Sequence, residues 1–168
     1  SSSDVVLFHA AAGGVGQIFS QWAKGIGCKL IGTVGSDEKI DIAKKNGCDY
    51  VINYRSQDFV KEVKDITKGA GVSVVYDGVG KNTFQGSVDC LKPRGYFVLY
   101  GQSSGAVPPI DPQLLNRKGS IFLTRPTLAS YMLNREELNW RSGDIFRWIE
   151  QGMLQIRIGL SLPLKNAP

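Results

Sequence analysis

The sequence predicts an α/β protein: a doubly wound, parallel, six-stranded sheet with helices on both faces. Three observations support this prediction. Apolar segments alternate with amphipathic helical patterns along the chain, which is the order typical of parallel β–α–β units. The segments VVLFH, VSVVYD and YFVLY are nearly continuously apolar, as expected for strands that are buried on both sides. Glycine is abundant, with 20 among 168 residues, as many turns between strands and helices require.

Six short apolar segments are the predicted strands. In chain order they are Val5–His9, Lys29–Val34, Tyr50–Tyr54, Val72–Asp77, Tyr96–Tyr100 and Ser120–Thr124. Pro93–Gly95 is expected to break the chain before the fifth strand, and Gly101–Pro112 to form a looser crossover before the sixth. Ile156–Pro168 is predicted to form a further strand and the proline-rich start of another segment. Because parallel strands need right-handed crossovers, the connecting helices should cover both faces of the sheet.

Helical periodicity lies between the strands. The first predicted helix, Gly14–Ile26, carries one apolar stripe, and Gly27 is expected to end it. Ser36 is expected to cap the second helix, with Asp37 and Glu38 in its first turn. The remaining predicted helices are Gln57–Thr67, Asn82–Leu91, a short turn at Gln113–Asn116, and Arg135–Gln151. The last of these is expected to bury four apolar side chains: Leu138, Ile145, Phe146 and Ile149.

The composition is that of an ordinary globular domain. Hydrophobic residues make up 42% and charged residues 21%, so we expect a folded core. The net charge of +5 suits an anionic small ligand, but the basic residues are scattered, and we expect no nucleic-acid partner. No signal peptide or membrane span is visible, so we expect a cytoplasmic protein with no membrane partner. The three cysteines and the single histidine lie far apart, so no metal site is expected.

A glycine-rich turn joins the first strand to the first helix in the sequence VVLFHAAAGGVG. Gly13, Gly14 and Gly16 let the backbone turn tightly and approach a ligand. The helix that follows aims its first N–H groups and the positive end of its dipole at that ligand. Ala11 holds the first place of the pattern, which is A-x-G-x-x-G instead of G-x-G-x-x-G. A strand, this turn and a helix together predict a Rossmann fold that binds a nucleotide pyrophosphate.

The tip of the second strand indicates which dinucleotide is bound. An acidic residue there usually binds the ribose of NAD, whereas a cation without an acid suits the 2′-phosphate of NADP. The tip carries Gly35 and Ser36, with Lys39 one helical turn further on, so we expect NADPH. The alternative is that Asp37 or Glu38 turns inward and binds the ribose of NAD.

The motifs HAAAGGVG, IGTVGSDEK, VINYR, VVYDGVG, YGQSSG and LTRPTL follow one another along the chain. With them the sequence resembles the zinc-independent quinone oxidoreductases, the zeta-crystallin-like group of the medium-chain dehydrogenase/reductase superfamily. The resemblance implies an NADPH-dependent enzyme that reduces a quinone or other small electrophilic substrate, as a homodimer. Because family members are longer, residues 1–152 are expected to be the NADP-binding Rossmann domain. Residues 153–168 are expected to lead into a largely absent GroES-like catalytic domain, which makes the chain alone an incomplete enzyme.

The resemblance also implies cofactor-binding residues at the strand ends. It places Gly13, Gly14 and Val15 at the pyrophosphate, and Gly35, Ser36, Lys39 and Tyr54 around the 2′-phosphate and adenosine. It places Gly78 and Val79 along the cofactor. The residues expected near the nicotinamide half are Tyr100, Gly101, Gln102, Ser103, Thr124, Arg125 and Pro126.

Several side chains are candidates for the chemistry, each with a structural alternative. His9 is either a hydrogen-bond or proton donor beside the cofactor or a histidine packed beneath the glycine turn. Asp77 is either an acid near the cofactor or a turn residue. Tyr100 and Tyr131 could line a quinone pocket, and Arg125 could contact phosphate or form a salt bridge between subunits. No catalytic residue is assigned, because the cofactor supplies the hydride while the protein orients it and excludes water.

Two other functions stay open from the sequence. A zinc-independent enoyl or alkenal reductase would share these motifs, because its substrate-side residues would lie outside this chain. A non-catalytic module that binds a nucleotide or RNA is supported only by the scattered basic charge. The sixth strand and the loop Thr127–Tyr131 that follows it are the expected dimer edge.

Overall fold

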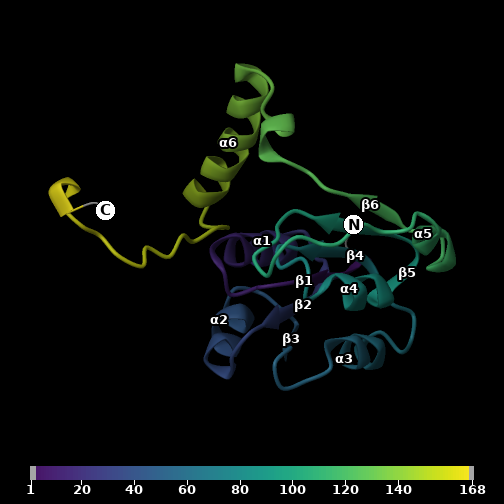
Figure 1. Ribbon diagram of the computed structural model, residues 1–168. Helices are drawn as coiled ribbons and strands as arrows, with labels where there is room; N and C mark the ends of the chain where they lie inside the picture. Colours follow the sequence, from purple (N-terminus) through teal and green to yellow (C-terminus); the bar gives the residue numbers. More distant parts are fainter. Residues whose placement is uncertain (1–2, 167–168) are drawn as a thin grey trace.

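The computed structural model describes residues 3–166, which form one open sheet of six parallel strands (Figure 1). The strands are β1 (Val5–Phe8), β2 (Lys29–Val34), β3 (Tyr50–Asn53), β4 (Val72–Asp77), β5 (Leu91–Leu99) and β6 (Phe122–Thr124). Their order across the sheet is β3-β2-β1-β4-β5-β6, so the direction of winding reverses between β1 and β4. Ligands of doubly wound sheets bind at this switch point, beyond the carboxyl ends of the strands. The predicted fold class is confirmed.

Helices cover both faces of the sheet. They are α1 (Gly14–Gly25), α2 (Ile40–Lys45), α3 (Phe59–Ile66), α4 (Phe84–Cys90), α5 (Gln113–Arg117) and α6 (Arg135–Glu150), with 3₁₀ turns η1 (Asp37–Lys39), η2 (Leu128–Tyr131) and η3 (Leu164–Asn166). α1 and α2 pack on one face of the sheet, and α3, α4 and α5 pack on the other. Because successive side chains of a strand point to opposite faces, the adjacent Leu7 and Phe8 of β1 enter different cores.

Two strands begin elsewhere than predicted. β5 already begins at Leu91, because Pro93–Gly95 forms an irregularity within the strand instead of a break before it. β6 begins only at Phe122, because the φ of Ser120 is 56°, outside the extended region. Both changes leave the carboxyl ends of the strands, where the candidate site lies, close to their predicted positions.

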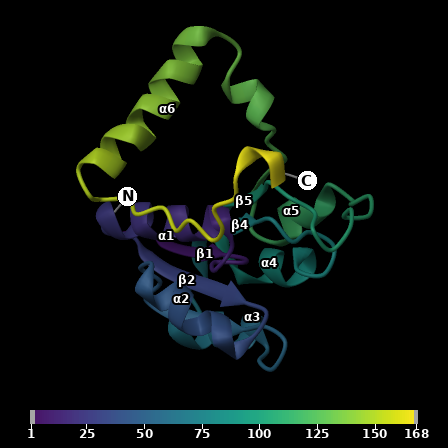
Figure 2. The ribbon, with the colours of Figure 1, turned by 90° about the vertical axis from the view of Figure 1, so that its left-hand side faces the viewer.

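The prediction that α6 buries four apolar side chains is wrong. Leu138 is only partly buried, and the other three are exposed, namely Ile145, Phe146 and Ile149. Figures 1 and 2 both show α6 projecting from the body of the protein. Its last turns contact α1 through the stacked rings of Trp148 and Trp22, whose centroids are 6.2 Å apart. Helical spacing identifies the apolar face of a helix but not what covers that face.

The predicted strand at the end of the chain is also wrong for residues 156–166. This segment runs away from the sheet without pairing to it (Figure 1). A segment with a strand-like sequence forms a β-strand only where it can hydrogen-bond to a neighbouring strand. Residues 167–168 lie outside the described part. Gln155 is tied to α1, because its N–H donates to Gln21 Oε1 at 2.8 Å and its carbonyl accepts from Gln21 Nε2 at 3.1 Å. Within residues 3–166, the helices lack the length and apolar character that crossing a bilayer requires.

Candidate functional site

The glycine-rich turn packs tightly between β1 and α1. Ala10 has a φ of 58°, and its carbonyl accepts a hydrogen bond from the N–H of Gly13 at 2.9 Å. A Cβ on Gly16 would lie 2.6 Å from the carbonyl oxygens of both Ala10 and Ala11, so α1 can approach the turn this closely only with glycine there. Gly13 is the N-cap and offers no side chain to the first turn. The first N–H groups of α1 therefore remain available to an anion.

A hollow of about 340 Å³, which we name the β2–β3 hollow, opens beside this turn. Its lining residues are Ala10, Ala12, Gly13, Val34, Gly35, Ser36, Lys39, Tyr54 and Arg55. The register pairs Val34 with Asn53, which brings the residues that follow β2 and β3 side by side. A Cβ on Gly35 would lie 3.1 Å from the Tyr54 hydroxyl, so glycine makes room for that ring. Five of the predicted cofactor residues meet here: Gly13, Gly35, Ser36, Lys39 and Tyr54.

The β2–β3 hollow is positively charged. Lys39 and Arg55 line it, and neither forms an ion pair within residues 3–166. None of the described residues that line it is acidic. Asp37 instead accepts a hydrogen bond from Asn53 Nδ2 at 2.7 Å. Ser36 stands at the N-cap of η1, but its side chain caps no N–H. That corrects the predicted cap, because the side chain belongs to the lining of the hollow.

A second hollow, of about 410 Å³, lies on the α1 face of the sheet; we name it the β5–β6 hollow. Its lining residues are Phe8, Val15, Phe19, Tyr76, Val98, Tyr100, Thr124, Pro126 and Tyr131. The walls are mainly aromatic and aliphatic, which suits a flat, weakly polar ring. Burial and, to a smaller extent, the charge of Asp77 together raise the pKa of Tyr100 to about 12, so the phenol keeps its proton at neutral pH. Four predicted cofactor residues meet here: Val15, Tyr100, Thr124 and Pro126.

The turns after β4 and β5 interlock at the strand ends. The N–H of Ser103 donates to the Gly78 carbonyl at 3.1 Å, and the N–H of Ser104 donates to the Val79 carbonyl at 2.8 Å. A Cβ on Gly101 would lie 2.6 Å from the Gly78 carbonyl oxygen, so the two backbones touch. The turns thus unite five predicted cofactor residues that line neither hollow: Gly78, Val79, Gly101, Gln102 and Ser103.

Two predicted cofactor residues lie apart from these groups, and one residue that lines the β2–β3 hollow was not predicted. Gly14 begins α1, with nothing within 4 Å of the place of a Cβ. Arg125 is exposed, and its Nη1 donates to the Pro126 carbonyl at 3.4 Å. The missed residue is Arg55. The motif VINYR could have identified it, because Arg55 directly follows Tyr54 at the tip of the strand beside β2.

His9 and Asp77 belong to a buried hydrogen-bond chain. His9 Nδ1 lies 2.9 Å from Thr33 Oγ1, and its Nε2 lies 2.9 Å from Ser87 Oγ. The Ser87 hydroxyl donates to Asp77 Oδ2 at 3.1 Å. Burial lowers the pKa of His9 to about 4, although Asp77 acts to raise it, so the imidazole is neutral at pH 7. These contacts support a packed histidine for His9 and a turn residue for Asp77.

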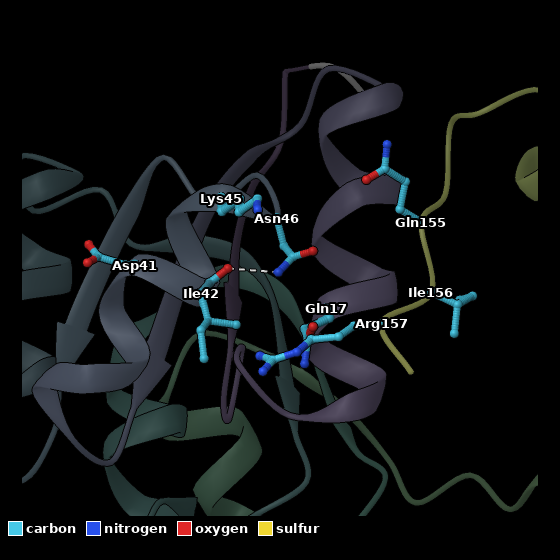
Figure 3. A pocket seen from close by; sticks show the side chains of 8 residues that line it. All are labelled: Gln17, Asp41, Ile42, Lys45, Asn46, Gln155, Ile156 and Arg157. Atoms are coloured by element: carbon cyan, nitrogen blue, oxygen red, sulfur yellow. Dashed lines mark hydrogen bonds between the residues drawn. The ribbon is translucent and has the colours of Figure 1, made fainter. Parts of the chain in front are cut away.

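A third hollow, of about 380 Å³, lies between α1, α2 and residues 155–157 (Figure 3). Its lining residues are Gln17, Asp41, Ile42, Lys45, Asn46, Gln155, Ile156 and Arg157. Two of its amide groups already bond the backbone, because Gln17 donates to the Ala12 carbonyl and Asn46 to the Ile42 carbonyl. It contains no predicted cofactor residue, so the candidate site remains at the strand ends. Within residues 3–166, no three His, Cys, Asp or Glu side chains gather as a metal site would require.

The sequence of this chain is similar to those of known proteins. The family described as zinc-binding dehydrogenase matches residues 14–141. The chain is 50% identical to quinone oxidoreductase 1 of Escherichia coli (strain K12) and 47% identical to a 2-haloacrylate reductase of a Burkholderia species, covering 96% and 98% of this chain. It spans 50% of the length of each of these relatives.

A solved structure extends the likeness to three dimensions. The Escherichia coli quinone oxidoreductase complexed with NADPH matches with a TM-score of 0.90 at 49% identity, covering 93% of this chain and 48% of that chain. The resemblance inferred from the motifs is thereby confirmed. The chain belongs to the zinc-binding dehydrogenase family, and its relatives there include the quinone oxidoreductases.

Proposed function

We propose that the chain is the NADPH-binding domain of an NADPH-dependent quinone oxidoreductase. The observation that carries this proposal is the β2–β3 hollow, where Lys39 and Arg55 are unpaired and the described lining is free of carboxylates. A 2′-phosphate carries close to two negative charges at neutral pH, so these cations attract it, whereas a carboxylate would repel it. The likeness to a quinone oxidoreductase crystallised with NADPH supports the same choice.

Different residues of the chain would bind different parts of the cofactor. The N-terminus of α1, at Gly14 and Val15, would bind the pyrophosphate. The β2–β3 hollow would take the 2′-phosphate, and the apolar β5–β6 hollow would receive the flat nicotinamide ring and exclude water from it. When bound, the cofactor supplies the hydride that reduces the quinone. The protonated phenol of Tyr100 lies in the β5–β6 hollow as a hydrogen-bond donor.

The remaining part of the substrate site would come from outside this chain. The chain spans half the length of its relatives, so we propose that residues 1–152 are the nucleotide-binding domain and that residues 153–168 lead into a catalytic domain. That domain would cover the exposed apolar side chains of α6, which include Ile145, Phe146 and Ile149. A relative named as a 2-haloacrylate reductase is 47% identical, and a different substrate for so similar a sequence supports the proposal that the second domain selects the substrate.

Removing either cation of the β2–β3 hollow tests the 2′-phosphate assignment. Lys39→Ala and Arg55→Ala should each weaken binding of adenosine 2′,5′-bisphosphate about tenfold, because each removes one charge-assisted contact. Lys44→Ala is the matched control, since it removes the same charge from an exposed position on neighbouring α2, outside the hollow. Calorimetric titration gives the three dissociation constants. Equal affinities for all three variants would contradict the assignment.

We also propose that the chain forms a homodimer through β6. This strand is an edge of the sheet, and the side chain of Phe122 on it is 52% exposed. An open, apolar edge strand offers backbone groups for pairing with a second copy. Sedimentation equilibrium should find a dimer, and Phe122→Lys should shift it to monomer. A wild-type chain that stays monomeric at all concentrations would contradict the proposal.

A further inference from the structure

Four polar side chains form a buried chain beneath the switch point of the sheet. His9, Thr33, Asp77 and Ser87 are each 0% exposed. His9 follows β1, Thr33 lies in β2, Asp77 ends β4 and Ser87 lies in α4, so the hydrogen bonds cross the point where the winding reverses. Among the described residues, no buried side-chain polar atom lacks a partner. Such fully satisfied networks hold their members in one arrangement.

The Asp77 carboxylate fixes the direction of these hydrogen bonds. Its Oδ1 accepts the N–H groups of Val79 at 2.7 Å and Gly80 at 3.0 Å. Its Oδ2 accepts the hydroxyl of Thr83 at 2.7 Å and that of Ser87 at 3.1 Å. An ionised carboxylate only accepts hydrogen bonds, so four donors converge on it. The carboxylate therefore holds both the turn after β4 and the start of α4.

The same direction selects the tautomer of His9. Because the Ser87 hydroxyl proton points to Asp77, the Ser87 oxygen must accept from His9, whose Nε2 therefore carries the proton. The unprotonated Nδ1 then accepts from the Thr33 hydroxyl. Each group has one role: Thr33 donates to His9, His9 to Ser87 and Ser87 to Asp77. Loss of the imidazole would leave the Ser87 oxygen without its buried donor and release one constraint on the carboxylate.

Asp77 also connects this chain to the turn after β5. Its backbone carbonyl accepts the N–H groups of Tyr100 at 2.9 Å and Gly101 at 3.2 Å. The two turns are further joined where the N–H of Ser103 bonds the Gly78 carbonyl. A shift of Asp77 would therefore move both turns together, whereas neither turn contributes a residue to the lining of the β2–β3 hollow.

We propose that His9, as the neutral Nε2–H tautomer, is a positioning residue that sets the turns after β4 and β5 against the nicotinamide half of NADPH. It acts through Ser87 and Asp77 and does not itself touch the cofactor. The inference rests on the proposed function, because it needs the cofactor to reach these turns. In this proposal, His9 affects binding of the nicotinamide half of the cofactor and not of the half that carries the 2′-phosphate.

Two ligands distinguish binding at the two halves of the site. NADPH reaches the nicotinamide side, whereas adenosine 2′,5′-bisphosphate lacks that half and reports on the β2–β3 hollow alone. His9→Phe keeps a ring of similar shape but removes both nitrogens. His9→Gln is the matched control, since its amide returns an N–H donor toward Ser87. Ser87→Ala breaks the same chain from the other side and serves if the phenylalanine variant does not fold.

Calorimetric titration of the whole chain gives the expected pattern. Wild type should bind NADPH more tightly than adenosine 2′,5′-bisphosphate. His9→Phe and Ser87→Ala should weaken NADPH binding about fivefold or more and leave bisphosphate binding within about twofold. His9→Gln should restore most of the NADPH affinity, which a purely structural role for the ring would not predict.

Three results would overturn the inference. Equal losses for both ligands would mean that His9 only stabilises the fold, and unchanged affinities would mean that the turns do not depend on it. A wild type that binds NADPH no more tightly than the bisphosphate would mean that the turns contribute nothing. If wild type binds neither ligand, the proposed function itself fails, and this inference fails with it.

Discussion

Replacing Gly16 by alanine tests the close packing of α1 on the turn after β1. The added Cβ would lie 2.6 Å from the carbonyl oxygens of Ala10 and Ala11 and 2.7 Å from the carbonyl carbon of Ala11. All three are backbone atoms, so no side chain can rotate away and the helix itself must shift. Overpacking of this kind costs about 1–3 kcal/mol. For a chain of this size that loss lowers Tm by about 2–4 °C per kcal/mol.

Gly25→Ala is the matched control, because it lies in the same helix with nothing within 4 Å of its Cβ position. Alanine is the better helix former by up to about 1 kcal/mol, so this variant should keep or raise the free energy of unfolding. Urea unfolding and calorimetry measure both variants. The shift of α1 should also weaken NADPH binding in Gly16→Ala. A Gly16→Ala protein as stable as wild type, with the same NADPH affinity, would refute the reasoning.

Two further predictions concern stability. Asp58→Ala should lower the free energy of unfolding by about 0.5–2 kcal/mol, because Asp58 Oδ1 accepts the N–H groups of Val60 and Lys61 at the start of α3. The control is Asp65→Ala, which removes only an exposed ion pair. Urea unfolding measures both variants, and equal losses of stability would contradict the prediction. Burial lowers the pKa of His9 from 6.5 to about 4 in the folded state, so between these pH values the unfolded chain binds more protons. Stability from this group is therefore complete above about pH 6.5 and falls by up to about 3 kcal/mol as the pH drops to about 4. Urea unfolding at a series of pH values should show this loss in wild type and not in His9→Gln, and parallel pH profiles of the two would contradict it.

The strands could be predicted well from the sequence because they are buried on both faces. Continuous apolar runs such as VVLFH leave few alternatives, and the strand ends then place the glycine turn and the tip of β2 at one edge of the sheet. The residues of the β2–β3 hollow followed from that placement. Arg55 was missed because the search for a 2′-phosphate contact stopped at β2 and did not include the neighbouring β3, whose tip carries it.

What covers a helix could not be predicted. The spacing of Ile145, Phe146 and Ile149 identifies an apolar face of α6, but these side chains are exposed in this chain. An amphipathic pattern reports that a face needs a partner and not whether that partner lies in the same segment. The hydrogen bonds of His9 were likewise beyond the sequence, because Ser87 lies 78 residues away along the chain.

Titration of the wild-type chain with NADPH and, separately, with NADH tests the central claim most directly. The two cofactors differ only in the 2′-phosphate, which Lys39 and Arg55 of the β2–β3 hollow should recognise. We expect NADPH to bind at least about tenfold more tightly, a difference of about 1.4 kcal/mol. Equal binding, or tighter binding of NADH, would contradict the account and assign the ribose contact to Asp37 or Glu38 instead.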